Sequence, residues 1–277
     1  MTANSWLREA RAKLEAASVS TARLDSLVLL EDATGKDRAW LLAHPEFELP
    51  AALATILDAR VYRRAQHVPL AYIRGHAEFY GREFAVNEHT LVPRPETESM
   101  IELLRDLAKR ERQRLSGALL ADIGTGSGVI GITAKLEFPE TQVIAMDIDE
   151  KCLETARENA RHLNADVTFL HGNLLEPLDV SDSYQTHTLL CNLPYVPDNF
   201  QINTAATHEP RHALYGGADG LDLYREIFGQ IATLETKPVY ILAESLPPQH
   251  EVLTAIAHDA GYALRQTNDF IQLFARG

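Results

Sequence analysis

The sequence predicts an α/β fold, in which a mostly parallel sheet with helices on both faces and an antiparallel C-terminal edge follows a small helical bundle. Strand-like and helix-like segments alternate from residue 118 onward, a pattern typical of parallel sheets. A glycine-rich turn follows the first of these strands and leads into a helix. Before residue 70, apolar residues instead recur at helix spacing. The sequence therefore predicts two domains of different class.

The helical domain is predicted over residues 1–70. Its apolar residues are spaced for four helices, and these stripes are most simply the core of a small bundle. The stripes and segments are Trp6, Leu7, Ala10 and Leu14; Leu24, Leu27 and Val28; Asp37–Leu42; and Ala51–Arg64, which follows Pro50.

Residues 71–96 are predicted to be a β-hairpin and a Pro-rich linker, because glycine, proline and aromatic residues are frequent there. Ala77–Val86 predicts a hairpin that turns at Gly81. The Pro-rich stretch leads into a helix over Thr97–Arg114. Two charged residues of this stretch are interpreted as pairing with the next domain and not as catalytic: Arg94 and Glu96.

The second domain is predicted over residues 97–277. Parallel strands are expected at Ala118–Asp122, Gln142–Met146, Val167–Leu170, Thr188–Cys191 and Val239–Ala243. The helices between them are expected at Ser127–Glu137, Asp149–Leu163, Leu221–Leu234 and Gln249–Ala260. A final antiparallel hairpin is expected from Tyr262–Gln266 and Phe270–Arg276. Ligands of such sheets bind at the carboxyl ends of the strands.

The turn Gly124-Thr125-Gly126-Ser127-Gly128 is a candidate cofactor-binding loop, because glycine lets the backbone approach a ligand closely. Asp147 ends the next strand, where a carboxylate can accept hydrogen bonds from ribose hydroxyls. Both features suit S-adenosylmethionine and NAD, and Gly126–Gly131 also fits the dinucleotide fingerprint. Asp122, just before the turn, favours S-adenosylmethionine, because a carboxylate can attract its ammonium group through water or backbone groups and would repel a pyrophosphate.

The second candidate site is Asn192-Leu193-Pro194-Tyr195, which follows an apolar strand. An amide or aromatic amine nitrogen is a poor nucleophile because its lone pair is delocalised. If the Asn192 side-chain oxygen and the Leu193 carbonyl each accept one of its N–H bonds, the lone pair faces an incoming methyl group, and positioning replaces a strong base. The same four residues also fit an ordinary strand-to-loop exit. The glycine turn and Asp147, expected at the same sheet edge, favour the catalytic interpretation.

The net charge of −13 is unevenly spread over the 277 residues. Residues 1–75 carry +1 and the remainder carries −14, so extended nucleic-acid binding by the second domain is not expected. A cluster of arginines is compatible with a local basic contact, although a solvated helix face is the simpler interpretation. The cluster consists of Arg60, Arg63, Arg64 and Arg74.

The chain has no run of eighteen apolar residues and no signal-peptide pattern, which predicts a cytoplasmic protein without membrane association. Cys152 and Cys191 lie in a predicted helix and a predicted strand and are expected to be buried, reduced thiols. The eleven histidines form no metal-binding motif, so no metal site is expected.

Taken together, these motifs resemble the release-factor glutamine methyltransferases of the HemK type over nearly the whole chain. The most specific of them is the stretch from Pro93 to Glu98. The other matching segments are Ala22–Asp25, Gly35–Glu46, Pro69–Gly75, Glu78–Gly81, Asp122–Gly128, Glu209–Arg211 and Gly216–Leu221. The chain departs from the family at Leu193, where the family usually has proline, and after Glu244.

The resemblance implies a class I S-adenosylmethionine-dependent methyltransferase domain with a Rossmann-like sheet. It also implies that the N-terminal helical domain docks the protein substrate, a peptide chain release factor, and that the enzyme methylates the glutamine side-chain amide of its Gly-Gly-Gln motif. It assigns the methionine part of the donor to Gly124–Gly128, the ribose to Asp147, and the adenine to Leu174 or the neighbouring Asn173. Plain core packing is an equal alternative for Leu174.

The resemblance assigns the substrate glutamine to Asn192, Leu193, Pro194 and Tyr195, with Tyr195 packed on the amide plane and Asn192 also bordering the donor. Two other classes remain open. Asn-Leu-Pro-Tyr also resembles adenine-amino-group methyltransferases that act on ribosomal RNA or DNA, although the acidic second domain argues against such a substrate. A non-catalytic protein-binding module is the third possibility, and the glycines, Asp147 and Asn192 argue against it.

Overall fold

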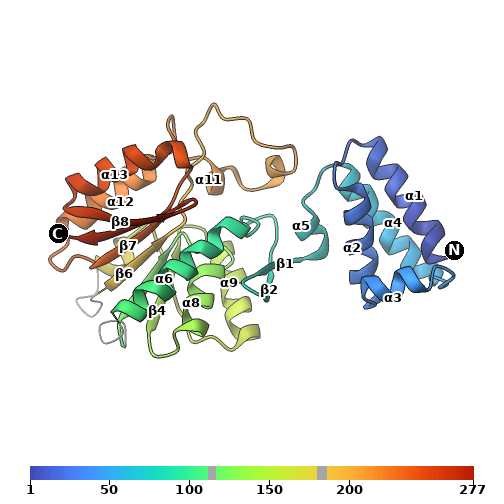
Figure 1. The fold of residues 1–277 in the computed structure, drawn as a ribbon, viewed down its shortest axis with the longest axis horizontal. Coiled ribbons are helices and arrows are strands. Elements are labelled where there is room, and N and C mark those ends of the chain that lie inside the picture. The colour runs from blue at the N-terminus through green and yellow to red at the C-terminus, as the bar shows by residue number, and fades with distance from the viewer. Residues whose placement is uncertain (112–116, 180–185) are drawn as a thin grey trace. The chain divides into compact units, whose positions relative to one another are not determined.

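The computed structural model describes residues 1–111, 117–179 and 186–277, and these form two compact units (Figure 1). The N-terminal unit comprises Met1–His76 and Ile202–His208. The sheet unit comprises Ala77–Gln201 and Glu209–Gly277. The last residues of the helix predicted over Thr97–Arg114 lie outside the described ranges.

Residues 1–76 of the N-terminal unit fold into α1 (Ala3–Ala16), α2 (Ala22–Thr34), α3 (Arg38–Ala43), α4 (Ala51–Ala65) and α5 (Leu70–Arg74). The first four were predicted, and α5 was not. Trp6 and Leu14 of α1 are buried as expected. In α2, Leu29 and Leu30 are fully buried, whereas Leu24 is 47% exposed. The prediction that Leu24 lies in the core was wrong, because the inward face of α2 includes the next residue, a polar one that forms an ion pair.

That residue is Asp25, and three of the four clustered arginines pair with it or with Asp32. Arg64 Nε lies 2.7 Å from Asp25 Oδ2, and Arg60 Nη1 lies 2.6 Å from Asp32 Oδ2. Arg74 Nε lies 3.2 Å from the other oxygen of Asp32. The two aspartate side chains are only 6% and 11% exposed. These arginines therefore neutralise acids within the unit and form neither a basic patch nor a solvated face.

The N-terminal unit continues beyond residue 70, where the sequence-based boundary was set. α5 adds Ile73 to the bundle core, and Arg74 reaches back to α2. The unit also takes in Ile202–His208, which the sequence prediction assigned to the second domain. Here His208 Nε2 lies 3.0 Å from the carbonyl oxygen of Gln66. Contacts between segments far apart in the chain set this boundary, and composition alone does not reveal such contacts.

The sheet unit contains a seven-stranded sheet in the order β5-β4-β3-β6-β7-β9-β8. Its strands are β3 (Leu119–Ile123), β4 (Gln142–Asp147), β5 (Thr168–His171), β6 (Thr186–Cys191), β7 (Tyr240–Glu244), β8 (Tyr262–Asn268) and β9 (Ile271–Arg276). β3 to β7 pair in parallel, and β9 pairs antiparallel with β7 and β8. The predicted fold class is confirmed. The strand order reverses between β3 and β6, which is the switch point where ligands bind in such sheets.

Helices cover both faces of the sheet (Figure 1). They are α6 (Glu98–Arg110), α8 (Val129–Glu137), α9 (Glu150–Leu163), α12 (Asp222–Thr233) and α13 (His250–Asp259), with short helices α10 (Glu176–Asp179) and α11 (Arg211–Leu214). Alternate strand residues point to opposite faces. Leu120 packs in the cluster with α6 and α8, whereas Ala121 packs in the cluster with α12 and α13. No helix in the described ranges is long and apolar enough to cross a membrane.

The predicted hairpin is present as β1 (His76–Phe79) and β2 (Arg82–Ala85). Its turn residues Tyr80 and Gly81 both have positive φ, as a two-residue hairpin turn of type I′ requires. Phe79 and Phe84 are buried in the core of the sheet unit. The hairpin therefore belongs to that unit, although the sequence analysis treated residues 71–96 as a linker.

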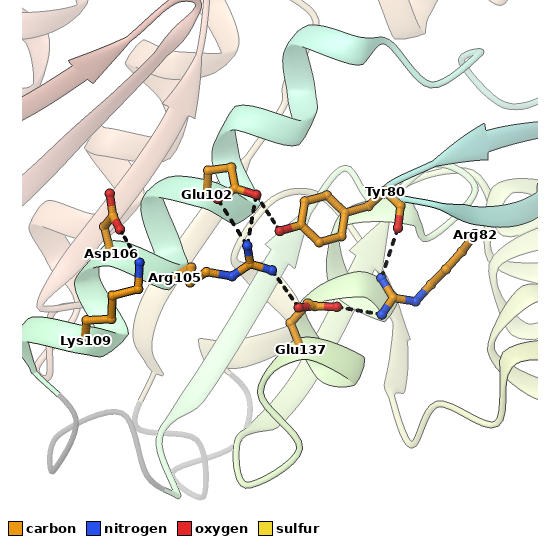
Figure 2. A network of polar contacts seen from close by, with 7 residues as sticks. All are labelled: Tyr80, Arg82, Glu102, Arg105, Asp106, Lys109 and Glu137. Atoms are coloured by element: carbon orange, nitrogen blue, oxygen red, sulfur yellow. Dashed lines mark hydrogen bonds and ion pairs between the residues drawn. The ribbon is translucent and has the colours of Figure 1, made fainter.

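Charged residues fix the hairpin to the helices (Figure 2). Tyr80 Oη donates a hydrogen bond to Glu102 Oε1 of α6. Glu137, at the end of α8, accepts hydrogen bonds from Arg82 at 2.6 Å and from Arg105 of α6 at 2.8 Å. One carboxylate thus joins the hairpin, α6 and α8.

Candidate active site

A cavity of about 320 Å³ lies at the carboxyl ends of β3, β4 and β6, within the sheet unit. This volume suits a small-molecule site. It is lined by these predicted site residues: Gly124, Thr125, Gly126, Ser127, Asp147, Leu174, Asn192, Leu193 and Pro194. Gly128 and Tyr195 do not line it. The sequence analysis missed several lining residues, among them Leu91, Pro93, Thr97, Ile148 and His212.

The glycine turn connects β3 to α8 and is attached to the neighbouring strand. The Thr125 amide donates to the Met146 carbonyl at 2.8 Å. Gly126 has a φ of +56°, so the turn needs a residue that tolerates the left-handed region. Gly128 has a different role from the predicted cofactor contact, because a methyl group there would lie 2.7 Å from Ile132 Cδ1 and 3.1 Å from Ala156 Cβ. It allows close packing of the turn against α8 and α9.

Asp147 ends β4 directly opposite this turn. Its Oδ2 accepts a hydrogen bond from the Gly126 amide at 2.9 Å, and its Oδ1 accepts one from the Asp149 amide at 2.9 Å. Burial raises the pKa of Asp147, while these two amides act in the opposite direction. Each carboxylate oxygen retains a further lone pair. Asp147 can therefore hold the turn and still accept hydrogen bonds from a diol in the cavity.

Asp122 is fully buried and does not line the cavity. Its Oδ2 accepts hydrogen bonds from the Thr125 hydroxyl at 2.5 Å and the Gly131 amide at 2.8 Å. Burial raises the pKa of Asp122 to about 6. The attraction of an ammonium group, which was expected to act through water or backbone groups, would have to pass through the turn that Asp122 holds.

Leu174 forms part of the cavity wall with its neighbour Asn173. Leu174 is 8% exposed and has a φ of +48°, which a residue with a side chain adopts at a cost of roughly 1–2 kcal/mol. Such strained backbone is typical of ligand sites. Leu174 also packs in a core cluster, so the two interpretations of this residue are compatible.

Asn192 follows β6 and is half-buried at the cavity. Its Nδ2 donates a hydrogen bond to Thr97 Oγ1 at 3.2 Å. Among the described residues, no donor is bonded to its Oδ1. The side chain therefore has its nitrogen engaged by the protein, while its acceptor oxygen has no partner within the described part of the chain.

Tyr195 is not among the residues that line the cavity, although the sequence analysis expected it to pack on a bound amide. Its hydroxyl donates to Glu244 Oε1 at 2.9 Å, and its carbonyl accepts from Gln249 Nε2 at 2.8 Å. The Tyr224 hydroxyl, in turn, lies 2.5 Å from the Glu244 carbonyl. Burial raises the pKa of Tyr195 above its usual range, and the Glu244 carboxylate adds to this.

Two glycines pack closely against the backbone of the Asn192–Tyr195 segment. A methyl group at Gly216 would lie 2.2 Å from the Pro194 carbonyl oxygen, and one at Gly220 would lie 2.0 Å from that of Tyr195. Elsewhere near the cavity, Arg94 Nη2 lies 2.6 Å from Glu209 Oε1, which confirms the predicted pairing of Arg94. The sequence analysis did not identify Glu244 and Gln249 as partners of Tyr195. The signal that could have indicated Glu244 is an acidic residue at the end of β7, close to the switch point.

The two cysteines are buried and free, as predicted. Burial raises the thiol pKa of both Cys152 and Cys191, so neither is a ready nucleophile. No group of three or more histidine, cysteine, aspartate or glutamate side chains within residues 1–111, 117–179 and 186–277 is arranged to hold a metal ion.

Family models match both parts of the chain. Residues 5–75 match the PrmC N-terminal domain, and residues 101–210 match the methyltransferase small domain. The cavity has the features that S-adenosylmethionine requires: a glycine turn, a strand-end carboxylate free to accept further bonds, and an apolar wall at Leu174. The protein is thus an S-adenosylmethionine-dependent methyltransferase.

Curated relatives narrow this class. The chain is 37% identical to the release factor glutamine methyltransferase of Koribacter versatilis, over 83% of this chain and 81% of the relative. It is 34% identical to that of Deinococcus radiodurans, over 92% and 90%. The Bacillus anthracis protein is 38% identical over 75% and 74%. The chain belongs to the release factor glutamine methyltransferase family.

Solved structures share the fold at low identity. The hMettl16 catalytic domain in complex with MAT2A 3′UTR hairpin 1 has a TM-score of 0.57 at 14% identity, covering 90% of this chain and 89% of that one. The Thermus thermophilus 16S rRNA N2 G1207 methyltransferase, in complex with AdoMet and guanosine, has a TM-score of 0.51 at 16% identity, covering 73% and 49%. These likenesses support the fold and carry no information about the substrate of this chain.

Proposed function

We propose that the protein transfers the methyl group of S-adenosylmethionine to the side-chain amide nitrogen of the glutamine in the Gly-Gly-Gln motif of peptide chain release factors. The observation that carries this proposal is the position of Asn192 at the cavity, with its nitrogen bonded to Thr97 and its oxygen without a partner in the described ranges. The family relationship supplies the substrate class. Such a substrate also makes the cytoplasm the expected location.

The acceptor nitrogen is oriented by two oxygens of the Asn192–Tyr195 segment. Asn192 Oδ1 and the Leu193 carbonyl each accept one N–H of the substrate amide, which directs the nitrogen lone pair toward the donor. The donor supplies the electrophilic methyl group. Pro194 limits the flexibility of the backbone after Leu193. Tyr195 anchors the end of the segment through the hydrogen bond that its hydroxyl donates to Glu244.

The donor is held by main chain and by one carboxylate. Gly124, Thr125, Gly126 and Ser127 border its methionine part, and Asp147 accepts hydrogen bonds from its ribose. Leu174, with Asn173 beside it, forms the wall for its adenine. Burial of Asp147 strengthens such bonds, because a charge in a low-dielectric site interacts more strongly with its donors.

Mass spectrometry of a whole release factor after incubation with enzyme and donor tests this function. A mass increase of one methyl group, located to the Gly-Gly-Gln glutamine by fragmentation, is the expected result. Ribosomal RNA and DNA are the matched alternative substrates, since Asn192 could orient an adenine amino group in the same manner. Methylation of nucleic acid without methylation of the release factor would replace the proposed substrate.

The N-terminal unit is proposed to dock the release factor. It carries nearly neutral charge, in contrast to the acidic remainder, and it matches the PrmC N-terminal domain. Removing residues 1–76 should preserve donor binding and abolish methylation of whole release factor, while a short Gly-Gly-Gln peptide is still methylated slowly. The control is a variant that retains the unit but carries His208→Ala, which removes one internal contact of the unit. Full activity of the truncated enzyme on intact release factor would contradict docking by this unit.

A further inference from the structure

Thr97 lies at the junction of a short 3₁₀ turn and α6, within the Pro-Arg-Pro-Glu-Thr-Glu stretch. Its side chain is almost completely buried at 2% exposure, and its Oγ1 accepts the hydrogen bond from Asn192 Nδ2 at 3.2 Å. In the proposed reaction Asn192 contacts the substrate amide, whereas Thr97 contacts Asn192. Two segments that are distant in the sequence are therefore joined at the atom group that is expected to orient the substrate.

We propose that Thr97 is a positioning residue that fixes which end of the Asn192 amide faces the substrate. This inference rests on the proposed function of Asn192. The two ends of an asparagine amide are nearly the same in shape but opposite in hydrogen bonding, since the oxygen accepts and the nitrogen donates. Only the orientation with Oδ1 toward the cavity can accept an N–H of the substrate. The flipped orientation would set two donors against each other.

The Thr97 hydroxyl is bonded to the nitrogen of the Asn192 amide and not to its oxygen. A hydroxyl has one proton to donate and two lone pairs to accept with. Because Asn192 Nδ2 donates to Thr97 Oγ1, a lone pair of the hydroxyl is used and the amide oxygen is left for the substrate. Loss of the Thr97 hydroxyl would remove the acceptor that holds Nδ2 in this orientation.

At the other end of the segment, Tyr195 Oη donates a hydrogen bond to Glu244 Oε1, 2.9 Å away. The Asn192–Tyr195 segment is therefore held by side-chain hydrogen bonds at both of its ends. Since the side chains of Thr97 and Glu244 are almost entirely enclosed, water cannot easily replace these partners.

The test compares Thr97→Val, which keeps the shape and removes the hydroxyl, with Thr97→Ser, which keeps the hydroxyl. For Thr97→Val we expect kcat on the methyl-accepting substrate to fall by about 10–100-fold, because the amide is no longer held in one orientation. The donor Kd, measured by calorimetry, should change by less than about threefold, which also reports that the variant is folded. Thr97→Ser should recover most of the lost kcat. If Thr97→Val is poorly folded, Thr97→Ala serves the same comparison.

A double-mutant cycle separates positioning from direct contact, because Thr97 also lines the cavity. In an Asn192→Ala background there is no amide to orient, so adding Thr97→Val should change the single-turnover rate by no more than about twofold. The proposal is overturned if Thr97→Val retains the wild-type rate, if Thr97→Ser is as impaired as Thr97→Val, or if the full effect persists without Asn192.

Failure of the Thr97 proposal can be distinguished from failure of the proposed release-factor substrate. Wild-type enzyme is first assayed on release factor and on ribosomal RNA, and the Thr97 comparison is run on whichever is methylated. Methylation of RNA alone would end the release-factor proposal, but a loss with Thr97→Val and recovery with Thr97→Ser on RNA would still support positioning, since an adenine amino group needs the same oxygen of Asn192.

Discussion

The cavity has two sides that are built differently. The donor side is the turn Gly124–Ser127, whose backbone amides bond to the Met146 carbonyl and to the Asp147 carboxylate at the end of β4. The acceptor side is the segment Asn192–Tyr195, which is held by side chains from distant segments. These side chains are Thr97, Glu244 and Gln249, each bonded to or next to the segment. One side is built from two adjacent strand ends, and the other from three separate parts of the chain.

The difference has a functional consequence. A site built from backbone and one carboxylate binds its ligand whether or not the reaction proceeds, so damage there should appear mainly in donor affinity. A site built from oriented side chains matters most as the lone pair turns toward the methyl group, so damage there should appear mainly in turnover. Substitutions on the two sides should therefore separate Kd from kcat.

The largest effect is expected from Asn192→Ala on the acceptor side. Removing the oriented oxygen should lower kcat by roughly 10²–10³-fold, comparable to the loss of one preorganised group in other enzymes. The donor Kd should change far less, because the turn and Asp147 are untouched. Single-turnover methylation of a release factor, alongside calorimetry with the donor, measures both quantities.

Asn192→Asp is the matched control, since it keeps an acceptor of the same size and adds charge. If orientation is the main role of the residue, the Asp variant should retain more activity than the Ala variant. A rate within about twofold of wild type for Asn192→Ala would remove the residue from the mechanism.

On the donor side, Asp147→Ala should weaken donor binding by about 1–3 kcal/mol, through loss of charge-assisted hydrogen bonds. Part of this loss comes from the Gly126 amide, which would lose its acceptor. Asp147→Asn separates the two contributions, because it keeps one acceptor but not the charge. At saturating donor, kcat should change by much less than Kd. Unchanged affinity in calorimetry would show that the carboxylate does not contact the donor.

Glu244→Gln tests the acceptor side through stability. Burial raises the pKa of Glu244 from 4.5 to about 7. Between these values the folded protein binds more protons than the unfolded chain, so the free energy of unfolding falls as the pH rises through this window. The Gln variant has no ionisable group at this position, so its free energy of unfolding should fall less over the same pH window. We expect a difference on the order of 1–2 kcal/mol, allowing for relaxation around the buried charge.

Denaturant unfolding at about pH 5 and about pH 8 measures this difference. Asp122 has the same sign of effect, because burial raises its pKa to about 6, and it remains in both proteins. The contribution of Glu244 is therefore obtained by subtracting the pH dependence of the Gln variant from that of the wild type. It should extend to a higher pH than the contribution of Asp122. If wild type and Glu244→Gln show the same pH dependence of unfolding, the pKa of Glu244 is not raised in the folded protein.

The same contrast explains what the sequence alone could predict. The fold class and the donor side follow from local patterns, because the turn and Asp147 end neighbouring strands and parallel strands end at one edge. Motif membership did not reveal which residues face the cavity: Gly128 packs against α8 and α9, and Tyr195 turns toward Glu244. The supports Thr97 and Gln249 could not be found, because tertiary contacts between distant segments carry no local pattern.

The smallest effect on turnover is expected for Leu193→Pro, which introduces the residue usual in the family. Only the carbonyl of this position takes part in the proposed contact, and proline retains it, so kcat should stay within about twofold to threefold. The structure adds a separate cost in stability. The side chain of Leu193 is 2% exposed and packs in the core cluster that contains Tyr224. Proline fills less of this core, so the free energy of unfolding should fall by about 1–3 kcal/mol.

Leu193→Ala keeps the amide and loses the side chain, so it isolates the packing contribution. A methyl group at Gly124 would lie 3.3 Å from Leu193 Cδ2, which shows how closely this side chain approaches the donor-side turn. Both variants should therefore loosen donor binding slightly, and about equally. If Leu193→Pro lowers kcat more than tenfold while Leu193→Ala does not, the backbone conformation at this position matters beyond its carbonyl. The two sides of the cavity would then be coupled through Leu193, and the separation of Kd from kcat would fail at this residue.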